Sequence, residues 1–219
     1  EEAGIFVQKT NQGGGNAIIR GYSASKVLLM VDGVRLNNST YRAGNHQYLT
    51  TVAPEMIDQI EVVHGPTSTQ YGSDAFGGTI HLRSMTPSLV PDSIRIAGRL
   101  LSQLSSADNE LSSSLQASIS GGKVAVSARG GYKDIGDIDQ GTHFGDGLSV
   151  LQDGKRRQPH NGYIIRDFDC KAVMELDSRT HLTAAVQLSR MPRVPRYDKY
   201  AYEGFLLWDY LDQNRDLSY

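Results

Sequence analysis

The sequence predicts an α+β domain followed by the first strands of an antiparallel β-barrel that crosses a membrane. Three observations support this fold class. Residues 1–87 contain short apolar runs separated by Gly- and Asn-rich turns. From residue 93 onward, apolar and polar residues alternate with a period of two, which is the pattern of a strand with one face in lipid. No apolar stretch approaches the ~18 residues that a membrane helix needs.

Composition excludes several classes of protein. The chain has 219 residues and a formal net charge of −2, so nothing in its charge favours a nucleic-acid partner. Mean hydropathy is −0.37, which agrees with a barrel because only every second residue of a barrel strand faces lipid. Cys170 is the single cysteine, which excludes an internal disulfide framework. The sequence starts at Glu1 without a signal-like segment, so we expect either a removed signal peptide or a start within a longer protein.

The first domain is expected to contain five strands and one short helix. Pro54 can occupy the first turn of a helix over Pro54–Asp58, because the missing N–H of proline has no partner there. Residues 88–92 are expected to link the domain to the barrel, since prolines interrupt any periodic pattern around them. The expected strands are Ile5–Gln8, Ala17–Arg20, Val27–Val31, Ile60–Val63 and Thr79–Arg83.

The second region, residues 93–219, is expected to begin with five barrel strands of about ten residues each. A soluble antiparallel sheet with one face on a core would show the same alternation. The expected apolar face carries Ile94, Ile96, Gly98 and Leu100; then Leu111, Ser113, Leu115, Ala117 and Ile119; then Val124, Val126, Ala128, Gly130 and Tyr132; then Phe168, Cys170, Ala172, Met174 and Leu176; and finally Leu182, Ala184, Val186 and Leu188.

The connections favour the membrane interpretation. Ser120–Gly122 and Asp177–Thr180 are tight turns, whereas about thirty residues, Lys133–Ile165, join the third strand to the fourth. Short turns at one end and long loops at the other are typical of outer-membrane barrels, although the loop near Ser105–Asn109 is short. Tyr132 and Phe168 lie at the long-loop end, where an aromatic girdle is expected. Five strands cannot close a barrel, so we expect more sequence to complete it.

A series of short motifs in the first domain carries a family resemblance. They are Ile19-Arg20-Gly21, Val27–Gly33, Pro54-Glu55, Ile60–Val63, Gly65-Pro66, Tyr71-Gly72, Ala75 and Gly77–Ile80. In this order and spacing, over about residues 5–85, the chain resembles the plug domain of TonB-dependent outer-membrane receptors.

The resemblance implies a plugged barrel of ~22 strands in the outer membrane of a Gram-negative bacterium. It also implies a transport receptor rather than an enzyme. The receptor would bind a scarce nutrient and release it inward with energy from the TonB complex, whose contact box lies upstream in this family. Outer-membrane lipid and lipopolysaccharide are the other expected partners. A passive porin or adhesin barrel would lack these motifs.

A finer resemblance points to haem or a haemoprotein as the transported ligand, with no intrinsic cofactor. Asn37–Asn45, Val194–Asp198 and Trp208–Tyr210 look similar to segments of haem-type receptors, although Phe76 departs from the pattern of those plugs. A ferric siderophore or cobalamin is the alternative ligand. Histidine commonly holds haem iron, and an aromatic face with a cation suits a flat, carboxylate-bearing molecule. The expected ligand-binding residues are His46, Tyr41, Arg42, Tyr48, His143 and His160.

Other polar clusters have simpler explanations. His64, His81 and His181 are expected to be structural, since they lie in or beside strands. Asp134, Asp137, Asp139 and Asp146 do not have the spacing of an EF-hand and are expected to be a solvated acidic loop. Lys155-Arg156-Arg157 could contact lipopolysaccharide phosphates, but a short basic run is more often simply exposed. The sequence contains no nucleophile elbow or zinc-protease motif.

Overall fold

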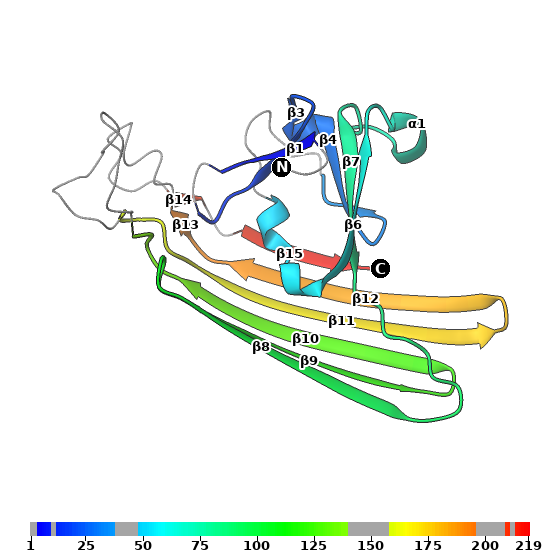
Figure 1. Ribbon diagram of the computed structural model, residues 1–219. Helices are drawn as coiled ribbons and strands as arrows, with labels where there is room; N and C mark the ends of the chain where they lie inside the picture. Colours follow the sequence, from blue (N-terminus) through cyan, green and yellow to red (C-terminus); the bar gives the residue numbers. More distant parts are fainter. Residues whose placement is uncertain (1–3, 10–11, 38–47, 140–157, 196–208, 211–212) are drawn as a thin grey trace.

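The computed structural model describes residues 4–9, 12–37, 48–139, 158–195, 209–210 and 213–219 (Figure 1). It has two parts, a small N-terminal domain and a long curved sheet on which that domain lies. No helix among the described residues is long and apolar enough to span a membrane. The two parts are joined by the segment between Ser84 and Arg95, which contains no strand.

The N-terminal domain contains two sheets. In the three-stranded sheet, β1 (Ile5–Gln8), β2 (Asn16–Ile19) and β3 (Tyr22–Ser23) are antiparallel. In the four-stranded sheet, the order is β5 (Val34–Arg35), β4 (Val27–Val31), β7 (Gly78–Ser84) and β6 (Ile57–His64). All five residues of β4 are buried, and β4 pairs with β7 in parallel. A strand buried on both faces requires such a continuous apolar run, which explains the composition of Val27–Val31.

The apolar core of this domain lies on both sides of β4. Val27, Leu29 and Val31 pack in the larger cluster with Ile19, whereas Leu28 packs on the other side. The Gly77–Ile80 motif serves close packing: a Cβ at Gly78 would lie 2.6 Å from the Val63 carbonyl oxygen, and the φ of Gly78 is +152°. Only glycine meets both conditions without strain.

The prediction of a helix over Pro54–Asp58 is wrong. The structure contains only a 3-10 turn, η4 (Pro54–Met56), and Ile57 is already extended at the start of β6. Ile60, Val62 and Val63 favour a strand, which pairs with β7 and extends back to the proline turn. The other short helices are η2 (Ala24–Lys26), η3 (Tyr48–Thr51) and α1 (Ser68–Tyr71).

The large sheet is antiparallel and its strands follow chain order. They are β8 (Arg95–Ser105), β9 (Glu110–Gly121), β10 (Val124–Ile135), β11 (Tyr163–Asp177), β12 (Thr180–Met191) and β15 (Gln213–Ser218). A separate two-stranded ribbon pairs β13 (Val194–Pro195) with β14 (Asp209–Tyr210). Strands β8 to β12 have 11 to 15 residues, enough for tilted strands to cross a bilayer.

The two faces of the large sheet differ as the sequence predicted. Leu115 and Met174 are 61% and 41% exposed on the outer face, whereas Lys171 and Gln187 are buried on the inner face against the N-terminal domain. A soluble sheet would bury its apolar face instead. The inner face is therefore polar and the outer face apolar, which is the arrangement of a transmembrane barrel wall.

The sixth strand, β15, was not predicted. Asn214 and Asp216 are exposed and alternate with the partly buried Arg215 and Leu217. Because its outer positions are polar, β15 lacks the apolar alternation by which the other strands were recognised. Arg190 of β12 pairs with Asp216 and compensates the exposed carboxylate.

Candidate functional site

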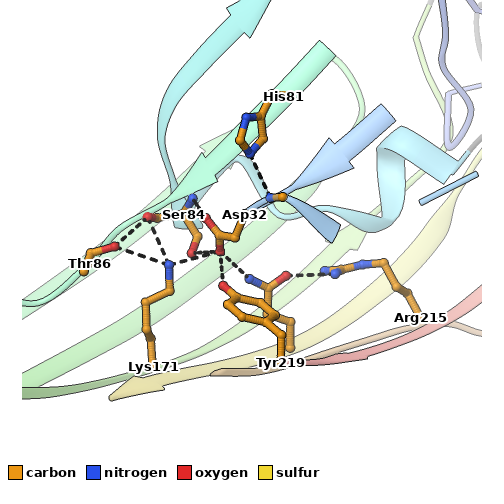
Figure 2. A network of polar contacts seen from close by, with 9 residues as sticks. Asp32, His81, Ser84, Thr86, Lys171, Arg215 and Tyr219 are labelled. Atoms are coloured by element: carbon orange, nitrogen blue, oxygen red, sulfur yellow. Dashed lines mark hydrogen bonds and ion pairs between the residues drawn. The ribbon is translucent and has the colours of Figure 1, made fainter. Parts of the chain in front are cut away.

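The contact between the N-terminal domain and the large sheet centres on Asp32 (Figure 2). Asp32 and Gly33 form the two-residue turn between β4 and β5, with φ values of +48° and +86°. Asp-Gly is favoured in such turns because both central residues take positive φ. The backbone N–H of Asp32 donates to the Leu82 carbonyl at 2.9 Å. The turn thereby holds the carboxylate toward the inner face of the sheet.

Donors from four segments of the chain converge on the Asp32 carboxylate. Ser84 donates from its backbone N–H at 2.8 Å and from its hydroxyl at 2.5 Å. Lys171 of β11 contributes its ammonium at 3.0 Å and Gln187 of β12 its amide at 3.4 Å. The phenol of Tyr219, directly after β15, also donates to Asp32. The carboxylate thus joins the N-terminal domain to three neighbouring strands of the sheet.

The same contacts favour the charged form of Asp32. Burial alone would raise its pKa, but hydrogen bonds from Ser84, Tyr219 and Lys171 together hold the pKa below its usual value. The Asp32 and Lys171 side chains are 12% and 7% exposed. A pair buried to this degree is strongly destabilising when one partner is removed, because the other charge is left uncompensated.

Lys171 also holds the start of the segment that joins the two parts. Its ammonium donates to the Ser84 carbonyl at 3.4 Å and to the Thr86 hydroxyl at 3.3 Å. On the other side, Arg215 donates to the Gln187 amide oxygen at 2.9 Å and to the Thr51 carbonyl at 3.3 Å. We call the group formed by Asp32, Ser84, Lys171, Gln187, Arg215 and Tyr219 the Asp32 cluster.

Two further polar contacts join the domain to the sheet nearer the long-loop end. Glu55 forms an ion pair with Lys133 of β10, and this contact outweighs the effect of burial and keeps the pKa of Glu55 below its usual value. Gln12 donates to Asp108, in the turn between β8 and β9, at 2.8 Å. The apolar contribution from the sheet to the larger core cluster comes from Leu217 of β15.

The polar groups of the Asp32 cluster are engaged with one another across the contact between the two parts. Among the described residues, no group of three or more His, Cys, Asp or Glu side chains could hold a metal ion. The polar groups therefore act in attachment, and their partners come from both parts of the molecule.

The expected ligand-binding residues remain predictions. His46, Tyr41, Arg42 and His143 lie outside the described residues. Tyr48 begins η3, and only its backbone is described. His160 lies between β10 and β11 with a φ of +62° and is half-buried.

Other polar residues singled out from sequence have structural roles where they are described. His81, expected to be structural, accepts a hydrogen bond from the Gly33 N–H at 2.9 Å. Asp137 accepts bonds from the backbone N–H groups of Asn161 and Gly162, at 2.8 and 3.0 Å. Asp146 and Lys155–Arg157 lie outside the described residues.

The sequence did not identify the Asp32 cluster as a site. Two signals for it were present: Asp32-Gly33 as a tight turn, and Lys171 among the residues opposite the apolar face of its strand. Neither signal pairs the two residues, which are 139 positions apart in the chain.

A sheet that is apolar outside and polar inside, with a folded domain held on its inner face, defines the wall of a plugged outer-membrane β-barrel. The family model of the TonB-dependent receptor plug domain matches residues 1–79. The chain thus carries a TonB-dependent receptor plug domain followed by early strands of the barrel, and it lies in the outer membrane.

Curated relatives match parts of the chain. The vitamin B12 transporter BtuB of Vibrio vulnificus strain YJ016 is 40% identical over 83 residues, which are 36% of this chain and 13% of the relative. The hemin receptor of Yersinia pestis is 40% identical over 67 residues, 31% of this chain and 9% of the relative. BtuB of Vibrio vulnificus strain CMCP6 is 31% identical over 149 residues, 65% of this chain and 23% of the relative. The chain spans less than a quarter of these relatives.

Solved structures share the fold of both parts. The copper transporter OprC aligns with a TM-score of 0.67 at 16% identity, over 97% of this chain and 29% of its own. The pyoverdine outer membrane receptor FpvA of Pseudomonas aeruginosa PAO1 aligns with a TM-score of 0.58 at 20% identity, over 86% of this chain and 24% of its own. At these identities the likeness concerns the fold alone.

Proposed function

We propose that the chain belongs to a receptor that imports a scarce nutrient through its barrel, with the plug as the gate and the TonB complex as the source of energy. The observation that carries this proposal is the polar contact between plug and wall. Among the described residues, hydrogen bonds and ion pairs such as Asp32–Lys171 and Glu55–Lys133 hold the plug, and apolar contact is limited to Leu217 and to Val194 and Tyr163 beside Gly13. Water can replace such bonds at a small net cost each. A plug attached in this way can shift without exposing a large apolar surface.

The transported ligand that we propose first is haem or a haemoprotein. The likeness over 67 residues to the Yersinia pestis hemin receptor supports this ligand. His46, His143 and His160 are the proposed iron ligands, and Tyr41, Arg42 and Tyr48 would contact the porphyrin face and its carboxylates.

Cobalamin or a ferric siderophore is the second candidate. Two of the curated relatives are vitamin B12 transporters. FpvA, whose fold this chain shares, is a pyoverdine receptor. The candidates differ in how they are bound, since cobalamin and siderophores bring their own metal ligands and need no histidine from the receptor. A passive porin or adhesin would have no use for a matched plug domain.

Absorbance titration of the full-length receptor in detergent distinguishes these ligands. Haem coordinated by histidine shifts its Soret band, and we expect this shift on titration with haem and its loss in one of His46→Ala, His143→Ala or His160→Ala. The same titration with cyanocobalamin is the control. Absence of any Soret shift would remove haem and leave the second candidate. Uptake by cells with and without a working TonB complex then tests the import step.

A further inference from the structure

The plug is attached to the described wall unevenly. The Asp32 cluster joins it to β11, β12 and the residue after β15, and Leu217 of β15 packs against its core. Within the described part of the chain, no side chain of β8 or β9 forms a hydrogen bond or an ion pair with the plug; Asp108, which bonds to Gln12, lies in the turn between these strands. The only bond from β10 comes from Lys133, near its long-loop end, as far as the described residues extend.

A cavity of about 320 Å³ lies where these attachments are missing. It lies between the segment after β7 and the inner face of β8, β9 and β10. It is near the end of the sheet that carries the short turns, which in outer-membrane barrels faces the periplasm. Its lining includes Asp58, Arg95, Ser118, Ser120 and Ser127.

The wall of this cavity suits the passage of a polar ligand. Ser118, Ser120 and Ser127 offer hydroxyl groups that can replace water around a ligand, and a small neutral side chain neither fills the space nor holds a ligand tightly. The size falls within the ~300–1,000 Å³ of ordinary small-molecule sites.

Charge on the same face favours an anionic ligand. Arg95 lines the cavity, and Arg99 lies four residues further along β8 on the same side of the strand. Both are exposed, and neither has an ion-pair partner among the residues that the structure describes. Asp58 is the one acidic residue in the lining and balances Arg95 there, so the excess positive charge on this face of β8 comes from Arg99, which lies beyond the cavity.

We propose that the ligand leaves the lumen between the plug and the β8–β10 wall, through this cavity, while the Asp32 cluster keeps the plug attached to β11, β12 and β15. The proposal rests on the import function above and names its exit and ligand class: a polar molecule that carries carboxylate or phosphate groups. Binding from outside precedes this step, so changes in the cavity alter the rate of uptake and not the affinity at the outer face.

The test uses cells that carry the full-length receptor, with radiolabelled haem, cyanocobalamin and ferric pyoverdine as probes. Ser118→Trp fills the cavity, and Ala117→Trp, the neighbouring residue on the lipid face of β9, is the matched control. We expect Ser118→Trp to lower the uptake rate at least tenfold with surface affinity within twofold of the wild type, and Ala117→Trp to leave both unchanged. Wild-type uptake by Ser118→Trp would overturn the exit route.

A charge-removing variant covers the case in which the large side chain disturbs folding. Arg95→Gln with Arg99→Gln changes exposed residues only, and we expect a threefold or greater loss of uptake rate at unchanged surface affinity. If Ser118→Trp loses surface binding and the arginine variant transports normally, the route is wrong. A wild-type receptor that imports none of haem, cyanocobalamin and ferric pyoverdine in TonB-competent cells overturns the proposed function itself, and the exit route with it. Failure of the exit route is therefore seen in the cavity variants, and failure of the proposed function is seen in the wild-type receptor.

Discussion

The plug and the barrel wall bury opposite kinds of side chain. In the plug, Leu28 and Val31 are fully buried and the charged side chains lie outside the apolar core. In the wall, Leu115 is 61% exposed and Gln187 is 2% exposed. The plug is built as a water-soluble domain, whereas the wall is built for lipid on its outer side and water or protein on its inner side. One chain therefore contains two folding environments.

The difference explains why the contact between the two parts is polar. The inner face of a barrel wall has few apolar side chains to offer, and the plug keeps its own in its core. What remains is hydrogen bonding and ion pairing, as at Asp32, Lys171 and Gln187. Such a contact positions the plug with little apolar burial, as the proposed role of the plug as a gate requires.

The largest effect is expected from a charge placed in the apolar core of the plug, which tests the contrast between plug and wall. Leu28→Asp places a carboxylate where the side chain is fully buried among Met30 and Ala75. We expect a loss of about 4 kcal/mol or more in the free energy of plug unfolding, since the charge has no partner there. Pulse proteolysis of the full-length receptor in increasing urea measures it. Gln59→Asp, at an exposed position of β6, is the control, and an equal loss there would contradict the assignment of the core.

The polar contact is tested by breaking the Asp32–Lys171 pair. Asp32→Asn leaves the Lys171 ammonium buried without its charge partner, and we expect plug attachment to weaken by about 3 kcal/mol. Lys171→Met in addition to Asp32→Asn removes the orphan charge and is expected to recover much of this loss. The urea midpoint of plug release from the folded barrel measures both variants and the single change Lys171→Met. Strict additivity of the two single changes would show that the pair is not coupled.

The lipid side of the comparison is tested on β9. Leu115→Arg puts a charge on the outer face, at a cost of ~2 kcal/mol in lipid near the middle of the bilayer. Gln116→Arg, one residue further along the same strand, faces the lumen and is expected to change stability by ~0.5 kcal/mol or less. Refolding of the full-length receptor into lipid vesicles at increasing urea concentrations measures both. Equal effects at the two positions would show that the assignment of the faces is wrong.

The sequence predicts those structural features that depend on a residue's neighbours in the chain, and it does not predict contacts between distant segments. Alternation assigned β8 to β12 and both of their faces, because a strand's side-chain direction has a fixed period. It missed β15, where Asn214 and Asp216 occupy the outer positions. The Asp32 cluster was out of reach for a different reason. Its pairings depend on how plug and wall are placed against each other, and local pattern carries no information about this.

The smallest of the predicted effects is that of low pH on the attachment of the plug to the barrel wall. The pKa values of Asp32 and Glu55 are held below their usual values by the hydrogen bonds and ion pairs that attach the plug, against the opposing effect of burial. Each carboxylate therefore stabilises the attached state above the pKa of an unfolded Asp or Glu, about 4, and loses this contribution as the pH falls through its own lower value. We expect the urea midpoint of plug release to be constant from about pH 6 to pH 8 and to decrease when the pH is lowered below about 4. Because the pKa of Asp32 is lowered, Asp32 is only partly protonated just below pH 4, so the loss there is smaller than in Asp32→Asn, where the charge is removed completely. In Asp32→Asn the acid limb should become shallower but remain, because Glu55 still titrates. A midpoint that falls between pH 8 and 6 would instead assign the attachment to a histidine.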